Sequence, residues 1–145
     1  MSPGDGNDRA RVQRFEPGLL LTIALGGAAG TVARAAIDRA LPAGGSGFPW
    51  ATWTVNVAGS LVIGLVVVAA LERAAPGRYL RPLVGTGFCG GLTTFSTFAV
   101  ETDRLLRAGS VWTAVLYVAA SLAAGLLAVA AGAGIARAVI NREEI

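Results

Sequence analysis

The chain has 145 residues, of which 54% are hydrophobic and 14% are charged, and its formal net charge is +3. Its apolar stretches are too long and too free of charge to be the helices of a water-soluble core, so lipid is its natural solvent. The positive side chains are all arginines at the ends of apolar runs, which argues against a nucleic-acid partner, because such a partner requires a clustered basic face.

Residues 1–16 combine Gly, Asp and Arg with little apolar content, so we expect a flexible N-terminal tail and no cleaved signal peptide. A helix needs about 20 apolar residues to cross a hydrocarbon core that is roughly 30 Å thick. Four segments meet this requirement, at 17–33 with a continuation past Arg34, at 50–71, at 83–100 and at 111–136. They are continuously apolar, which favours helices over alternating barrel strands. The sequence predicts an all-α membrane protein with four transmembrane helices in residues 17–140 and a C-terminal tail at 141–145.

Arg34 lies late in the first span, which is otherwise uncharged from Pro17 to Ala33. At this depth an arginine either snorkels to the membrane interface or attracts anions into a vestibule. The residues of this span do not decide between the two roles.

Asn56 lies in the middle of the uncharged second span. An unpaired amide there would cost several kcal/mol, so its side chain must have partners. They are either groups of a neighbouring helix or an anion that accepts a hydrogen bond from the NH₂ group.

The third span is rich in Gly, Ser and Thr between Gly85 and Phe98, and such a composition makes a poor continuous helix. We expect an interruption near Gly90–Thr94, which is tolerated at membrane depth only inside protein or beside a cavity. Freed backbone carbonyls can coordinate Na⁺, while free N–H groups and hydroxyls can bind an anion. The alternative is that the Ser and Thr hydroxyls only bond back to their own helix.

Phe95 and Phe98 are three residues apart and share one helix face, with Ser96 and Thr97 beside them. The two rings either face lipid or a neighbouring helix, or direct their electropositive edges at a dehydrated anion. Tyr117 and Ser121, one turn apart in the fourth span, present the same choice as Asn56 between interhelical contacts and a pore.

Eight arginines lie on one predicted side of the membrane and four on the other, a bias that depends largely on the tail. The positive-inside rule therefore gives only a weak orientation, and insertion in both directions is physically reasonable. Because four helices enclose little space, we expect two copies in an antiparallel, dual-topology homodimer.

The chain resembles the CrcB/Fluc fluoride channel family over roughly Leu19 to Ala136. The resemblance rests on Gly26–Arg34 (GGAAGTVAR), on Thr54–Ser60 (TVNVAGS) with Gly64, and above all on Gly87–Phe98 (GFCGGLTTFSTF). It implies an antiparallel dimer with two parallel fluoride pores and a central Na⁺ at the broken third helices.

The resemblance also implies a role for each candidate residue. The fluoride pore is expected to include Asn56, Phe95, Ser96, Thr97, Phe98, Tyr117 and Ser121. Arg34 would attract anions at the mouth, and the backbone carbonyls of Gly90 and Thr93 from both subunits would hold the Na⁺ as a structural cofactor. Two departures from the family pattern are Gly125, where many relatives have a serine, and Ala35, where an aromatic residue is usual.

The expected function is passive export of cytoplasmic fluoride through a channel in the plasma membrane, with fluoride, sodium, lipid and a second copy as partners. An enzyme is not expected, because the chain has no His, no Cys pair and no nucleophile beside a base. One alternative is a small multidrug or proton-coupled exporter, which requires a membrane-embedded carboxylate that the predicted spans lack. The other is a non-conducting assembly subunit.

Overall fold

The computed structural model describes residues 16–41, 47–72 and 78–143, and the regular structure in these ranges is helical. The elements follow in the order α1 (Pro17–Ala40), α2 (Trp50–Glu72), the π-helical segment η1 (Pro82–Cys89), α3 (Gly90–Leu92), α4 (Phe95–Arg107) and α5 (Val111–Glu143). Apart from Glu16, the predicted N-terminal tail lies outside the described residues, as do the last two residues of the predicted C-terminal tail.

Four helical segments of the described chain are long and apolar enough to cross a membrane, which confirms the predicted fold class at this level. They are Pro17–Ala40, Trp50–Ala70, Pro82–Arg107 and Val111–Arg142. Two bounds differ from expectation. The third segment continues past Val100 to Arg107, because Glu101 finds hydrogen-bond partners on α2 and α5. The fourth continues to Glu143, so residues 141–143 are helical.

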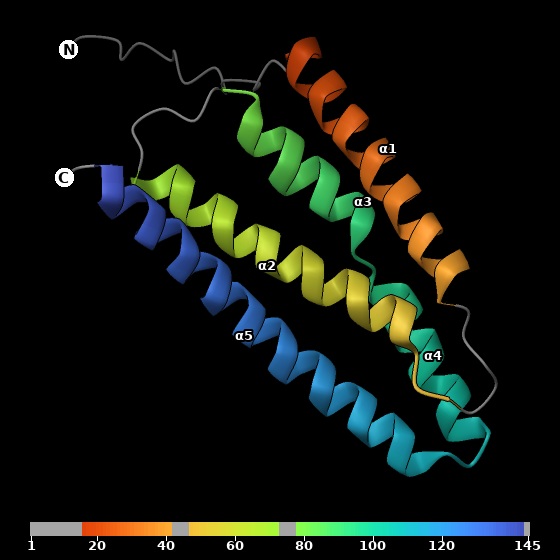
Figure 1. The fold of residues 1–145 in the computed structure, drawn as a ribbon. Helices are drawn as coiled ribbons and strands as arrows, with labels where there is room; N and C mark the ends of the chain where they lie inside the picture. Colours follow the sequence, from red (N-terminus) through yellow and green to blue (C-terminus); the bar gives the residue numbers. More distant parts are fainter. Residues whose placement is uncertain (1–15, 42–46, 73–77, 144–145) are drawn as a thin grey trace, which may run out of the picture.

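Consecutive spans run in opposite directions and pack as two pairs (Figure 1). Helix α2 lies along α5, while α1 lies along η1 and α3. Helix α4 then crosses to the end of the molecule where α2 and α5 begin. Large apolar side chains of α5 such as Leu126 (74% exposed) point away from the chain, as expected of a surface that faces lipid or another subunit.

Close backbone approach through glycine explains this pairing. A methyl group on Gly30 of α1 would strike the Phe88 carbonyl oxygen of η1, and one on Gly64 of α2 would strike the Val129 carbonyl oxygen of α5. In lipid there is no hydrophobic drive between helices, so dispersion contacts at such small residues are a main source of association. Gly30 and Gly64 therefore mark the helix contacts of the two pairs.

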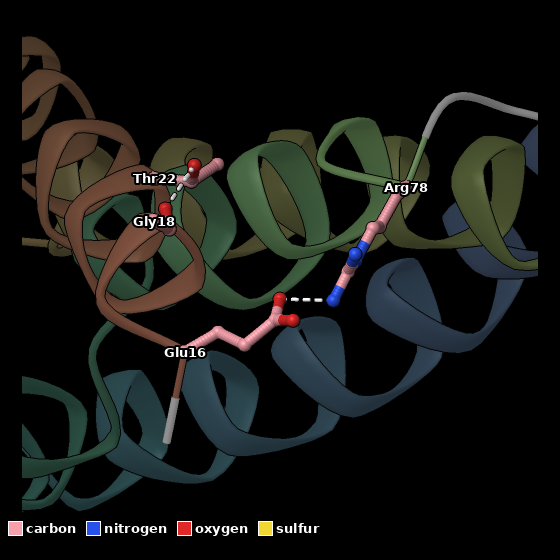
Figure 2. Close-up of polar contacts among 4 residues, drawn as sticks. All are labelled: Glu16, Gly18, Thr22 and Arg78. Atoms are coloured by element: carbon pink, nitrogen blue, oxygen red, sulfur yellow. Dashed lines mark hydrogen bonds and ion pairs between the residues drawn. The ribbon is translucent and has the colours of Figure 1, made fainter. Parts of the chain in front are cut away.

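An ion pair joins the start of α1 to the start of the third span (Figure 2). The Glu16 carboxylate pairs with the Arg78 guanidinium, which also lies 5.8 Å from the Tyr79 ring centroid. One turn into α1, the Thr22 hydroxyl donates to the Gly18 carbonyl at 2.7 Å. This is the bond to the carbonyl four residues earlier that Thr commonly makes in membrane helices. Both charged groups are exposed at the helix ends, so the pair contributes orientation more than stability.

Two residues between α3 and α4 leave the helical conformation. Helix α3 ends at Leu92, Thr93 has φ −83° and ψ 157°, and Thr94 has φ −151° and ψ 120°. Helix α4 starts at Phe95 with Thr94 as its N-cap, since the Thr94 side chain accepts a hydrogen bond from the Thr97 amide. The polar groups described below all lie around these two extended residues.

The substitution Gly91→Ala is expected to destabilise the fold by about 1–3 kcal/mol, because it forces a methyl group against backbone. The added Cβ would meet the Gly27 carbonyl oxygen and would lie 3.0 Å from the Thr31 amide nitrogen. Thermal unfolding in detergent measures the effect. Gly134→Ala is the matched control, because its Cβ meets nothing within 4 Å among the described residues. Equal unfolding temperatures for the two variants would contradict the packing described here.

Candidate functional site

Asn56 of α2 reaches across to the extended backbone of Thr94 and makes two hydrogen bonds with it. Its Nδ2 donates to the Thr94 carbonyl at 3.1 Å, and its Oδ1 accepts from the Thr94 amide at 2.9 Å. The partner that the sequence required for this half-buried amide is therefore the backbone of the third span. One Nδ2 hydrogen is used in this way, and an amide NH₂ group has two.

The hydroxyl of Thr94 organises the first turn of α4. Its Oγ1 accepts from the Thr97 amide at 3.2 Å and donates to Thr97 Oγ1 at 3.0 Å. Ser96 Oγ lies 3.2 Å from the same oxygen. Ser96 is exposed and Thr97 is half-buried, so this set of hydroxyls extends from the interhelical contact to the surface of the chain.

Thr93 and Gly90 lie on the α3 side of the break. The Thr93 amide and its Oγ1 both bond to the Cys89 carbonyl, each at 2.9 Å. Gly90 is exposed, and a Cβ built on it would meet nothing within 4 Å in the described part of the chain. No group of three or more His, Cys, Asp and Glu side chains that could hold a metal occurs among the described residues.

The two phenylalanines of α4 have different environments, although their ring centroids are only 5.8 Å apart. Phe95 is 81% exposed and projects from the chain. Phe98 is half-buried and packs against Tyr117 of α5, with 5.1 Å between ring centroids. One ring thus belongs to the core of the single chain, while the other is available to a neighbouring molecule.

Tyr117 is fully buried and its hydroxyl donates to Glu101 Oε2 at 2.8 Å. Glu101 Oε1 accepts from Thr52 Oγ1 of α2 at 3.0 Å. Sequence reasoning gave no site role to Glu101 or Thr52. The available signal was spacing, because Glu101 follows Phe95 and Phe98 in steps of three residues and so lies close to their helix face.

Glu101 bears on the exporter alternative, which requires a carboxylate within a span. It lies one residue past the predicted end of the third span, in the helical segment Pro82–Arg107, and its hydrogen bonds are partly buried.

We expect Tyr117→Phe to lower the free energy of unfolding by about 2 kcal/mol, since a hydrogen bond to a charged group contributes about 1.5–3 kcal/mol. The lost bond is the one from the tyrosine hydroxyl to Glu101 Oε2. Thermal unfolding in detergent is the measurement. Tyr79→Phe is a suitable control, because the Tyr79 side chain is exposed at the start of the third span. A Tyr117→Phe protein as stable as the Tyr79→Phe protein would contradict this prediction.

Ser121 lies one turn beyond Tyr117 on α5, and its Oγ is buried without a hydrogen-bond partner among the described residues. One turn further, a Cβ on Gly125 would lie 3.6 Å from Ser60 Oγ, so a serine hydroxyl could be accommodated at this position. The departure noted at Gly125 therefore leaves space beside Ser60 on α2. The predicted hydroxyl donor Ser121 faces the α2–α5 contact.

A shallow hollow of about 250 Å³ opens beside the break. It is lined by Asn56, Ser60, Ile63, Thr93, Thr94 and Phe95. Its polar groups are an amide, hydroxyls and backbone, and its apolar wall is an aromatic ring and an isoleucine. This combination suits a small anion that has lost most of its water.

Arg34 is half-buried on α1. It lies one turn beyond Gly30, whose Cβ position is 2.8 Å from the Leu92 amide nitrogen, and residues four apart share a helix face. Arg34 is thus on the side of α1 that meets the end of α3, rather than on a face turned away from the break.

Comparisons with known proteins agree on one family. The profile described as "CrcB-like protein, Camphor Resistance (CrcB)" matches residues 21–133. The chain is 46% identical over 110 residues to "Fluoride-specific ion channel FluC 1" of Mycolicibacterium paratuberculosis, covering 76% of this chain and 83% of the relative. It is 42% identical over 128 residues to "Fluoride-specific ion channel FluC 2" of Nocardia farcinica, covering 88% and 91%. It is 46% identical over 118 residues to "Fluoride-specific ion channel FluC" of Chlorobaculum tepidum, covering 81% and 94%.

Proposed function

Because this chain belongs to the CrcB-like protein family, we propose that it forms a fluoride-selective channel that exports cytoplasmic fluoride passively and so gives fluoride resistance. The carrying observation is the juxtaposition of an exposed Phe95 ring, the Asn56 amide and a row of hydroxyls around the extended residues Thr93 and Thr94. The chain is a multi-pass membrane protein, and the plasma membrane is the barrier that such export must cross.

The proposed anion path follows α4 and α5. Phe95 and Phe98 supply ring edges, which carry partial positive charge, and Asn56, Ser96 and Thr97 supply N–H and O–H donors. The remaining members are Tyr117 and Ser121. The Ser121 oxygen is buried without a hydrogen-bond partner in the described part of the chain, which supports a role for this residue, since a buried polar atom requires a partner. Donors closely spaced along a narrow path suit fluoride, which is smaller and costlier to dehydrate than chloride.

A second copy is proposed to complete the path. In the single chain the hollow beside the break is open, and the Phe95 ring is 81% exposed although it lies at membrane depth. The arginine distribution favours neither orientation strongly, so an antiparallel, dual-topology homodimer is compatible with insertion. In such a pair the exposed Phe95 of each copy would contact its partner. Arg34 is proposed to attract anions toward each entrance.

Sodium is the proposed structural ion at the centre of the dimer. The residues present fit it, because Thr93 leaves the helical conformation, the Gly90 carbonyl loses the Thr94 amide as its helical partner, and carbonyl oxygens are preferred ligands of hard cations. The bound ion would supply a fixed positive charge that lowers the cost of holding fluoride in a low-dielectric interior. The proposed ligands are backbone groups, so selectivity would depend on backbone conformation.

The proposed transport is passive and needs no coupling to a nucleotide or to protons. Hydrogen fluoride enters cells as a neutral acid and dissociates in the cytoplasm, and a negative-inside potential then drives the trapped anion out through an open pore. The half-buried Glu101 keeps a proton-coupled exporter of cations as the competing function.

Growth of a bacterium without fluoride exporters of its own separates these functions. Expression of the chain is expected to restore growth in millimolar fluoride and to leave sensitivity to cationic drugs unchanged. Protection against the drugs without protection against fluoride would favour the exporter. No protection against either would contradict the proposed channel when the protein is shown to be present in the membrane.

A further inference from the structure

The carbonyls that the break in the third span takes out of regular helical hydrogen bonding include those of Gly90 and Thr93. In a continuous α-helix each amide bonds to the carbonyl four residues before it, so the Thr94 amide would bond to Gly90 and the Thr97 amide to Thr93. Here the Thr94 amide donates to Asn56 Oδ1 at 2.9 Å, and the Thr97 amide donates to Thr94 Oγ1 at 3.2 Å. Side-chain oxygens have replaced both carbonyls.

The regular pattern holds up to the Thr93 amide, which bonds to the Cys89 carbonyl at 2.9 Å. The Thr94 and Thr97 amides, which would otherwise occupy Gly90 and Thr93, take side-chain acceptors instead. Gly90 and Thr93 are the residues whose carbonyls form the proposed sodium site. By binding these two amides, Asn56 and Thr94 keep them away from the Gly90 and Thr93 carbonyls, which are the proposed ligands of the ion.

We infer that Asn56 and Thr94 are positioning residues for the sodium ion, each keeping one carbonyl free by providing an alternative acceptor for its amide. This inference rests on the sodium site of the proposed function. Neither side chain needs to touch the ion. Thr94 is not among the site residues predicted from the sequence. Its hydroxyl accepts the hydrogen bond of the Thr97 amide, and this leaves the Thr93 carbonyl without that amide as a partner.

Two further contacts hold the extended backbone in place. Asn56 Nδ2 donates to the Thr94 carbonyl at 3.1 Å, which holds the next peptide unit, between Thr94 and Phe95. The Thr93 methyl group rests directly on Gly59 of α2, where any side chain would strike it. Helix α2 thus provides the Asn56 acceptor for the Thr94 amide and, at Gly59, a position without a side chain against which Thr93 packs.

The positioning role requires a side-chain hydrogen-bond acceptor at position 94, which need not be a hydroxyl. Ser, Asn and Asp accept the same N-cap hydrogen bond as Thr, whereas Val has the shape of Thr without an acceptor. A pore role for the Thr94 hydroxyl would instead require a donor O–H along the path. Thr94→Ser, Thr94→Asn and Thr94→Val separate these requirements.

The test is the effect of sodium on the purified full-length dimer in detergent. Retention of the dimer after heating is followed by size-exclusion chromatography across a NaCl series, with N-methylglucamine chloride keeping the ionic strength constant. The native chain, Thr94→Ser and Thr94→Asn are expected to gain stability with sodium. Thr94→Val is expected to require about tenfold more sodium for the same gain, from the usual cost of losing an N-cap.

Thr22→Val is the matched control, because it removes a threonine hydroxyl that only donates to a carbonyl of its own helix, Gly18, near the start of α1 (Figure 2). It is expected to respond to sodium as the native chain does. A native-like sodium response in Thr94→Val would overturn the inference and leave the proposed function intact. If Thr94→Val gives no folded dimer, Thr94→Asn decides: a retained response supports the inference, and a lost response in a folded dimer overturns it. A native chain without any sodium response would contradict the sodium site itself, which fluoride transport assays test separately.

Discussion

Replacing Phe95 with isoleucine is expected to reduce fluoride flux by about tenfold or more while leaving the single chain as well folded as before. An edge contact with an aromatic ring is worth about 1 kcal/mol, and the low dielectric of the path strengthens it. The ring is 81% exposed in the chain, so the fold loses little when the ring is removed. Flux from vesicles and thermal unfolding in detergent are measured on the same preparation.

Trp112→Leu is the matched control for this prediction. Trp112 is equally exposed, at 85%, but it lies at the start of α5 away from the break. Its substitution is expected to leave flux unchanged. Equal flux in the native chain and in Phe95→Ile would show that this ring does not line the path.

The substitution Asn56→Asp should cause the largest loss of flux, on the order of a thousandfold at neutral pH. Two unit charges about 4 Å apart repel each other by about 4 kcal/mol at an effective dielectric constant of 20, which corresponds to roughly that factor. The carboxylate keeps the Oδ1 acceptor for the Thr94 amide but loses the NH₂ donor to the Thr94 carbonyl. Some loss of stability is therefore expected beside the much larger loss of conduction.

Asn141→Asp provides the same chemical change at an exposed position near the end of α5. Its flux and stability are expected to match the native chain. If Asn56→Asp conducts as Asn141→Asp does, the Asn56 amide serves only the contact between α2 and the third span. The two isosteric variants thus separate a pore role from a structural role.

Much of the fold follows from the sequence because lipid imposes a simple requirement. The run from Trp50 to Leu71 carries no charge and is long enough to cross a membrane. Its helix can therefore be predicted without knowing which helices pack against it. The end of the third span was harder to locate. Glu101 reads as a residue of the membrane interface until its partners Thr52 and Tyr117 are known, and those lie 49 and 16 positions away in the chain.

The sequence names candidate site residues but does not determine their hydrogen bonds. Sequence and family resemblance identified Asn56, but the choice between helix contact and anion donor remained open. The structure shows two bonds from this amide to the Thr94 backbone, which is a contact between distant segments that no local pattern encodes. Thr94 was missed because an N-cap is recognised only when the helix start is known, and glycines obscured that start.

Fluoride release from vesicles that contain only the purified chain tests the central claim most directly. The vesicles are loaded with potassium fluoride and diluted into a potassium-free medium at equal pH, and valinomycin is added to allow charge balance. We expect rapid fluoride release at a fluoride electrode, with no comparable release of chloride from vesicles loaded with potassium chloride. Release no faster than from protein-free vesicles, or release of both halides at similar rates, would contradict a fluoride-selective path around Asn56 and Phe95.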